Sequence, residues 1–251
     1  MSVRQKTYAE NIKMQNLINQ INANMKGIFG VANTLDSLIA LQRLRRSGRR
    51  NLHNLIWERA YLQSAEFIET NLSEAVLFEF REQIWDYLIS KLQDDCDDNY
   101  CLEFGVAGGD SINWFSERLK NMKFYGFDSF HGLNEDWYGH HAIVGEYTQG
   151  GVLPKVNNNV SLVQGWFHDT VPEFCKNNPE VVSKTKLFHM DSDTYGSTKT
   201  VFDSIGHSLK PGVFVLFDEL TCYPNWQNGE YKALGEAQMK FNFQYQFKAF
   251  A

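Results

Sequence analysis

Two apolar runs, each ending in acidic residues, constrain this fold more than any other feature of the chain. The first run ends in Asp191, and the second ends in the pair Asp218–Glu219. Between the runs lie a segment with helical spacing and the helix-stopping pair Pro211–Gly212. Strand, helix and strand in this order predict a parallel βαβ unit. Open α/β sheets bind ligands at the carboxyl ends of their strands, so these three carboxylates are candidate site residues.

Strand-like runs alternate with helical patterns from Tyr100 to the end of the chain. Helices are expected to begin near Gly109, Thr170, Tyr195 and Gly229. This alternation predicts an α/β fold with a doubly wound, mostly parallel, Rossmann-like sheet. The expected strands are YCLEFG, KFYGFD, VSLVQG, KLFHMD, GVFVLFD and a last, half-buried edge strand, FNFQYQFKAF, at residues 100–105, 123–128, 160–165, 186–191, 212–218 and 241–250.

The first 95 residues have helical rather than strand-like spacing. Apolar residues recur at helical intervals around 17–21, 35–44 and 55–68, and again in FREQIWDYLISKL at 80–92. We therefore interpret residues 1–95 as an N-terminal helical extension with a lid or oligomerisation role. Residues 96–251 are then the sheet domain, although the boundary can equally be a seam within one domain.

Charge is distributed unevenly between these two parts. Residues 1–59 hold ten Lys/Arg and three Asp/Glu, whereas the rest of the chain holds 14 and 27. A positive arm beside an acidic body fits self-association or an anionic partner, which leaves open a homodimer through the N-terminal helices. We favour a solvated helical face for the arginines between 43 and 50. Nucleic-acid binding is not expected, because the chain is acidic overall and no aromatic residues interleave with the arginines.

The composition favours a folded protein without a membrane span. No apolar run approaches ~18 residues, and the N-terminus has no apolar core of a secretory signal. The four cysteines form no C-x-x-C pair, which is typical of free thiols in a reducing compartment. We expect a cytoplasmic protein.

A glycine-rich turn follows the first expected strand. Its sequence, EFGVAGG at 103–109, opens a helix, and small residues there let a main chain approach a ligand closely. The spacing E-x-G-x-A-x-G differs from G-x-G-x-x-G, which argues against a dinucleotide site and hence against an NAD-dependent oxidoreductase. A tight turn without a ligand is the alternative.

Two further strand ends fit a nucleoside. Asp128 ends the second strand, where a carboxylate can accept both hydroxyls of a ribose; its alternative role is to cap the turn at Ser129. Gly165, Trp166 and Phe167 follow the third strand, and the two aromatic rings can lie against an adenine or simply belong to the core.

Together these motifs resemble the class I S-adenosylmethionine-dependent methyltransferases, in particular the macrocin O-methyltransferase (TylF-type) family. The resemblance covers about residues 100–240, with seven strings in the family's order: EFGVAGGDS, YGFDSFHGL, GEY, QGWFHDTVP, HMDSDTYGSTKTVFDSI, LKPGVFVLFDE and YPNW..GEYKAL. It implies methyl transfer from S-adenosylmethionine to a hydroxyl of a small molecule, often on a sugar of a glycan or secondary metabolite. Several members bind Mg²⁺.

The resemblance also implies roles for individual residues. Asp191, Asp218 and Glu219 match the family's metal ligands, although the family usually has Asp-Asp at the last two positions. The family also tends to add a final strand beyond the last one expected here. The expected cofactor-binding residues are Glu103, Phe104, Gly105, Gly109, Asp110, Ser111, Asp128, Ser129, Gly165, Trp166, Phe167 and Asp191.

The transfer needs a group that removes the acceptor's proton. A bound cation lowers the pKa of a hydroxyl, and Asp191, which closes the strand nearest the expected methyl group, is our choice of general base. Asp193 is expected to cap the next helix, and His189 to be buried in the sheet. The loop histidines His131, His140 and His141 are alternative bases.

Residues after the acidic pair have two possible roles. Tyr223, Trp226 and Glu230 either form a wall for the acceptor or anchor the last helix. Two alternatives to a metal-assisted O-methyltransferase remain open: a metal-independent methyltransferase, and a non-catalytic binding protein that retains the fold.

Overall fold

The computed structural model describes residues 51–93 and 98–251. The apolar stripes expected around residues 17–21 and 35–44, and the arginines between 43 and 50, lie outside the described residues. The chain divides into compact units at 1–55 and 56–251. Within the described part, no helix has the length and apolar content needed to cross a membrane.

Among the described residues, two α-helices precede the central sheet. Helix α3 spans Leu52–Asn71, and α4 spans Arg81–Leu92. Helix α4 buries Trp85, Leu88 and Leu92 against the sheet and helix α5, which spans Asp110–Arg118. The expectation of helices before residue 95 is therefore confirmed for the described segments. The division at residue 95 stays a prediction.

Five parallel strands form the central sheet, as the sequence predicts. They are β2 (Tyr100–Phe104), β3 (Lys123–Asp128), β4 (Val160–Gln164), β5 (Thr185–Met190) and β6 (Phe214–Phe217). Their spatial order is β4-β3-β2-β5-β6. The chain first builds outward from β2 to β4 and then crosses to β5 on the other side of β2. The switch point of this doubly wound sheet therefore lies between β2 and β5, where a ligand crevice is expected.

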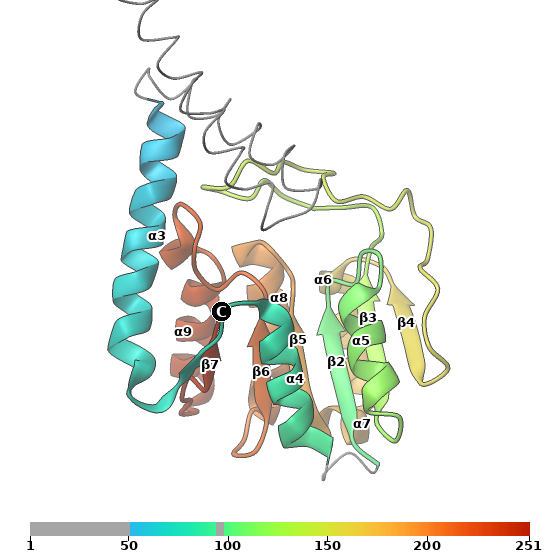
Figure 1. Cartoon of the computed structure of the whole chain (residues 1–251). Coiled ribbons are helices and arrows are strands. Elements are labelled where there is room, and N and C mark those ends of the chain that lie inside the picture. The colour runs from blue at the N-terminus through green and yellow to red at the C-terminus, as the bar shows by residue number, and fades with distance from the viewer. Residues whose placement is uncertain (1–50, 94–97) are drawn as a thin grey trace, which may run out of the picture. The chain divides into compact units, whose positions relative to one another are not determined.

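Helices cover both faces of the sheet (Figure 1). Helices α4 and α5 cover one face, where they share a core with Cys101, Phe124 and Leu187 of the strands. On the opposite face, Leu102 and Phe188 belong to a core shared with four helices. Neighbouring strand residues thus point to opposite faces, as the two-residue period of a strand requires. The helices of the second core are α6 (Phe167–Asn177), the short α7 (Pro179–Ser183), α8 (Tyr195–Ile205) and α9 (Glu230–Phe241).

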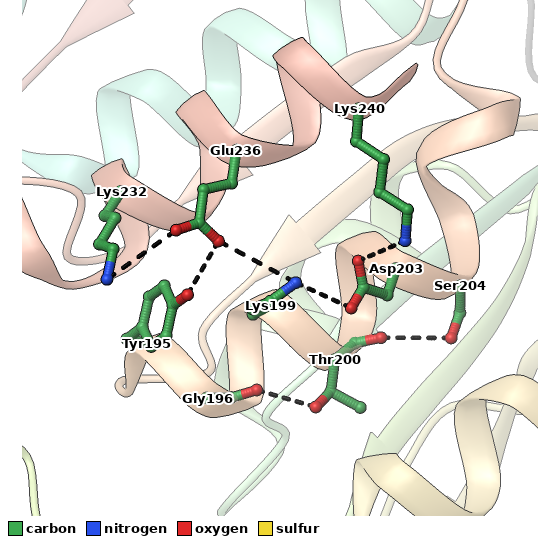
Figure 2. A network of polar contacts seen from close by, with 9 residues as sticks. All are labelled: Tyr195, Gly196, Lys199, Thr200, Asp203, Ser204, Lys232, Glu236 and Lys240. Atoms are coloured by element: carbon green, nitrogen blue, oxygen red, sulfur yellow. Dashed lines mark hydrogen bonds and ion pairs between the residues drawn. The ribbon is translucent and has the colours of Figure 1, made fainter.

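Helices α8 and α9 are also joined at their surface. Figure 2 shows Tyr195 and Lys199 of α8 beside Glu236 of α9, with Oη of Tyr195 donating to Oε2 of Glu236 at 2.8 Å. Nζ of Lys240 lies 2.9 Å from Oδ1 of Asp203. The hydrogen bond and the ion pair are partly exposed, so each contributes little by itself. Together they fix how the two helices lie against each other.

The prediction of a long last strand is wrong. Helix α9 runs to Phe241 and ends at Asn242, which has a left-handed φ of 54°. Only β7 (Ala249–Phe250) pairs, and it lies beside β1 (Val76–Leu77) rather than at the edge of the main sheet. The alternating aromatic residues instead form a cluster in which Phe247 and Phe250 contact Phe67 of α3. A two-residue period therefore reflects aromatic packing here and not strand pairing.

Gly105 is where the tips of β2 and β5 come closest. Its φ is +100°, and a Cβ built there would lie 1.7 Å from the carbonyl oxygen of Asp191. The amide of Asp191 donates to the carbonyl of Phe104 at 2.9 Å, which continues the ladder past the end of β5. Only glycine fits both this φ and this distance.

We predict that Gly105→Ala lowers the free energy of unfolding by at least ~1–3 kcal/mol, the cost of a strained φ alone, because the main chain of Asp191 must also move. Gly108→Ala is the matched control: Gly108 is exposed and a Cβ there meets nothing within 4 Å. Urea unfolding of both variants measures the difference. Equal stability of the two variants would show that the close approach does not constrain the fold.

Candidate active site

A cavity of about 350 Å³ opens at the carboxyl edge of the sheet, beside the switch point. Its lining comes from the segments that follow β2, β3, β4, β5 and β6. Seven of the predicted cofactor-binding residues line it: Gly105, Asp128, Ser129, Gly165, Trp166, Phe167 and Asp191. Strand ends far apart in the sequence thus meet at one cavity, as expected for parallel strands.

Five predicted cofactor-binding residues are not among those that line the cavity: Glu103, Phe104, Gly109, Asp110 and Ser111. Phe104 belongs to the core, where its ring stacks on Phe127 at 5.1 Å. Gly109, with φ +86°, is the N-cap of α5, and Asp110 begins that helix. Their direct contact with a cofactor stays a prediction.

Glu103 lies inside the sheet domain and is completely buried. Its Oε1 accepts from Oγ of Ser111, and its Oε2 lies 2.9 Å from Nδ1 of His189, the neighbouring residue on β5. Burial disfavours a charged imidazole, but the charge of Glu103 and this hydrogen bond outweigh it and raise the pKa of His189 to about 9. The prediction that His189 is buried in the sheet is confirmed, and its partner is Glu103.

Asp128 connects the turns that follow β2 and β3, both of which line the cavity. Its Oδ2 accepts from the amides of Val106 and Ala107 at 2.9 and 2.8 Å, and its Oδ1 accepts from the amide of Phe130 at 2.6 Å. Asp128 therefore fixes the glycine-rich turn after β2 to the turn after β3. The predicted capping role is real, and because the residue also lines the cavity, it does not exclude contact with a ribose.

Three carboxylates gather at the same cavity. Asp191, Asp193 and Glu219 each offer an oxygen, and these oxygens lie within 4.8 Å of one another. We call these residues the acidic cluster. Oε2 of Glu219 is buried and has no hydrogen-bond partner among the described residues. Hard oxygen ligands with one unsatisfied oxygen fit Mg²⁺ or a similar cation.

The acidic cluster resists ionisation when no cation balances its charge. Burial, and then the charge of Asp218, raise the pKa of Asp191 well above its usual range. The same two causes raise the pKa of Asp193 to about 7. Burial and the charge of Asp191 raise the pKa of Glu219. A cation would reverse these shifts, since opposite charge favours the ionised form.

The set of clustered carboxylates differs from the predicted metal ligands at one position. Asp193 joins Asp191 and Glu219, whereas Oδ2 of Asp218 lies 3.4 Å from Nη1 of Arg81. Consecutive residues at a strand end point to opposite sides, and Asp218 lies on the side of Leu216, towards α4. Asp218 is therefore outside the acidic cluster, although its charge acts on it.

Asp193 does not cap helix α8, so that prediction is wrong. The N-cap is Thr194, whose side-chain oxygen accepts from the amide of Ser197. Asp193 instead has a left-handed φ of 62°, a conformation that Asp adopts more readily than most residues. This φ breaks the strand geometry after Asp191 and leaves both carboxylates at the cavity.

The long loop after β3 supplies the rest of the lining, including Asn134, Trp137, His140 and Tyr147. Oε1 of Glu135 in this loop accepts from the amide of Gly196 at 2.9 Å, in the first turn of α8. Of these four residues, the sequence pointed only to His140, as an alternative base. Aromatic residues in a long glycine-rich segment were the available signal.

One of the three loop histidines lines the cavity. The ring of His140 lies 4.1 Å from that of Trp137, and burial followed by the charge of His141 lowers its pKa. His131 and His141 are not part of the lining. A neutral imidazole is thus available at the cavity for proton transfer.

Tyr223, Trp226 and Glu230 anchor helix α9 and do not form a wall of the cavity. They are 3%, 3% and 0% exposed, and none of them lines the cavity. The ring of Trp226 contacts Phe67 and Tyr231. The acceptor-wall interpretation is therefore wrong, because the segment after β6 turns into the core before α9 begins.

Residues 102–220 match the family model described as a methyltransferase domain. Among solved structures, the chain is similar to CalS11, a calicheamicin methyltransferase, with 26% identity and a TM-score of 0.51 over 62% of this chain and 72% of that one. These findings support a class I S-adenosylmethionine-dependent methyltransferase. No match is found among the curated proteins.

Weaker resemblances concern other methyltransferases. The mycinamycin-pathway enzyme MycE, in complex with Mg and SAH, has 14% identity and a TM-score of 0.35 over 55% of this chain and 32% of that one. A precorrin-6y C5,15-methyltransferase from Geobacter metallireducens has 15% identity and a TM-score of 0.39 over 66% and 77%. At these values neither resemblance bears on the activity of this chain.

The buried Glu230 generates a prediction about pH and stability. Burial raises its pKa from 4.5 to about 8, so the folded protein holds this proton more tightly than the unfolded chain does. Its contribution to stability is complete below about pH 4.5 and is lost as the pH rises to about 8. We predict that Glu230→Gln, measured by urea unfolding in EDTA, becomes steadily more stable relative to wild type between these pH values.

The matched control is Glu236→Gln, on the same helix but at the surface. It shows how much of any change comes from removing a carboxylate from this helix. A pH-independent difference between Glu230→Gln and wild type would show that Glu230 ionises as freely in the fold as in the unfolded chain.

Proposed function

We propose that this chain is an S-adenosylmethionine-dependent O-methyltransferase of the macrocin O-methyltransferase (TylF) type. Its reaction is the Mg²⁺-assisted methylation of a hydroxyl on a small molecule, such as a sugar of a glycan or secondary metabolite. The observation that carries the proposal is one cavity lined both by the glycine-rich turn with Asp128 and by the acidic cluster. The likeness to a calicheamicin methyltransferase supports a small-molecule acceptor.

The part of the cavity lined by the glycine-rich turn and Asp128 fits a nucleoside. Gly105 and Ala107 present main chain without bulky side chains, and Asp128 offers carboxylate oxygens for ribose hydroxyls. Phe167 lines the cavity while its ring contacts Phe104 edge-on at 6.1 Å, so it is both a core residue and a candidate adenine contact. A sulfonium donor is positively charged, and the acidic surroundings favour it.

The acidic cluster is the proposed place of hydroxyl activation. Asp191, Asp193 and Glu219 would hold the cation, which when bound lowers the pKa of a coordinated hydroxyl and stabilises the developing alkoxide. Asp191 is the proposed general base, since it lies at the cavity beside Gly105. The remaining task of the protein is to hold the acceptor oxygen in line with the methyl group.

Charge favours a neutral or cationic acceptor. Among the described residues that line the cavity there are four carboxylates, on Asp128, Asp191, Asp193 and Glu219, and no Lys or Arg. A phosphorylated acceptor would therefore meet only like charges unless cations intervened. The loop over the cavity also exposes Tyr138, Ile143 and Val144, which suits an acceptor with an apolar portion.

A metal-independent methyltransferase is the second candidate, and His140 is the observation that favours it. Its ring lines the cavity and its lowered pKa keeps it neutral, so it can accept a proton without a cation. The two candidates differ in their response to EDTA. The division at residue 95, a homodimer through the N-terminal helices and a cytoplasmic location remain further parts of the proposal.

We predict that S-adenosylhomocysteine binds wild-type protein in titration calorimetry and that Asp128→Asn weakens this binding ~10-fold or more, as expected for a lost hydrogen bond to a charged group. The control is Asp136→Asn, in the long loop after β3, which should bind S-adenosylhomocysteine like wild type. No binding to well-folded wild type would refute the methyltransferase proposal.

We predict that Mg²⁺ raises the melting temperature of the wild-type protein, because it binds carboxylates that repel each other in the fold. Asp193→Asn should abolish this shift, whereas Asp218→Asn should retain most of it. Differential scanning fluorimetry with and without EDTA measures both. The opposite ranking would restore Asp218 as the ligand, and no shift in wild type would favour the metal-independent candidate.

A further inference from the structure

Glu230 is a completely buried carboxylic acid that lies outside the cavity. Its Oε1 accepts from Oγ of Ser192 at 3.0 Å and from Oγ1 of Thr198 at 3.1 Å, and these two hydroxyls are 2.9 Å apart. Its Oε2 is buried without a hydrogen-bond partner among the described residues. Burying such a group is costly, so a helix anchor alone is a poor reason for a glutamic acid here.

Ser192 stands between two members of the acidic cluster. It separates Asp191 from Asp193, and the amide of Thr194 donates to its carbonyl at 2.6 Å. Asp193 has a left-handed φ of 62° within this turn. Such a conformation persists only where the surroundings fix it. Ser192 is the one residue between the two cluster carboxylates in the sequence. Glu230, which lies 38 residues further along the chain, accepts the hydrogen bond from its side chain.

We propose that Glu230 is a positioning residue for the acidic cluster: by holding Ser192, it sets Asp191 and Asp193 to face one cation. This inference rests on the proposed metal-assisted function. Outer groups that orient metal ligands typically affect metal affinity 10–100-fold when removed. Burial raises the pKa of Glu230 to about 8, and Oε1 is an acceptor in either protonation state, so glutamine can replace it.

Helices α8 and α9 are also in contact away from Glu230. Figure 2 shows that α8 and α9 are joined at the surface through Glu236, with Tyr195 and Lys199 on the other side. Glu236 is six residues from Glu230 on the same helix. It therefore serves as a matched control that removes an α8–α9 contact without touching Ser192.

The test is titration of the full-length protein with Mn²⁺, followed by electron paramagnetic resonance, in Glu230→Leu, Glu230→Gln and Ser192→Ala. We expect Mn²⁺ affinity to fall ~10-fold or more in Glu230→Leu and Ser192→Ala. Glu230→Gln should stay within about twofold of wild type, because its amide oxygen keeps the acceptor. Affinity for S-adenosylhomocysteine should be unchanged in all three variants. Glu236→Leu should bind Mn²⁺ like wild type.

Several results would overturn the inference. They are wild-type Mn²⁺ affinity in Glu230→Leu or Ser192→Ala, an equal loss in Glu236→Leu, or a parallel loss of S-adenosylhomocysteine affinity, which would indicate a general folding defect. If Glu230→Leu does not fold, Ser192→Ala decides, since it leaves α9 intact. Absence of Mn²⁺ binding in wild type would instead refute the metal-assisted function and this inference with it.

Discussion

The contact between Gly105 and the main chain of Asp191 is the constraint on which the site depends. It lies at the switch point of the sheet, where β2 and β5 run side by side and the chain leaves them towards opposite faces. Because Gly105 has no side chain, the turn that faces the nucleoside and the strand end that carries the acids share one cavity. Any Cβ at this position would push these two parts of the site away from each other.

Charge around this contact is arranged in two layers. Below the strand tips, Glu103 and His189 form a buried pair whose opposite charges balance. Above them, no Lys or Arg is among the described residues that line the cavity with the acidic cluster, and burial together with neighbouring negative charge raises the pKa values of its carboxyl groups. A fold that keeps repelling carboxylates half-buried gives up stability there, which is common where a site is shaped for a ligand.

The sequence predicts the sheet well because each central strand is a largely apolar run between turn signals. It fails at the end of the chain, where alternating aromatic residues contact α3 and only Ala249–Phe250 pairs. That outcome depends on tertiary contacts between distant segments. Local periodicity does not report them.

The same contrast holds for the residues at the cavity. Asp191 and Glu219, which the sequence marks because they close apolar runs, lie there, whereas the place of Asp193 rather than Asp218 beside them depends on one left-handed φ and on the side to which a strand end points. The role of these residues as metal ligands stays a prediction. The lining contributed by Trp137 and Tyr147 comes from a loop without periodicity. Glu230 was noted in the sequence as a wall or an anchor. Its link to Ser192 is visible only in three dimensions.

The central claim is that a sulfonium donor and a divalent cation share one cavity. A crystal structure with S-adenosylhomocysteine and Mn²⁺, using the anomalous signal of manganese, tests it most directly. The account predicts a manganese peak bound by Asp191, Asp193 and Glu219, with the ribose at Asp128 in the same cavity. A manganese peak bound by Asp218 away from the cavity, or a nucleoside outside it, would contradict the account.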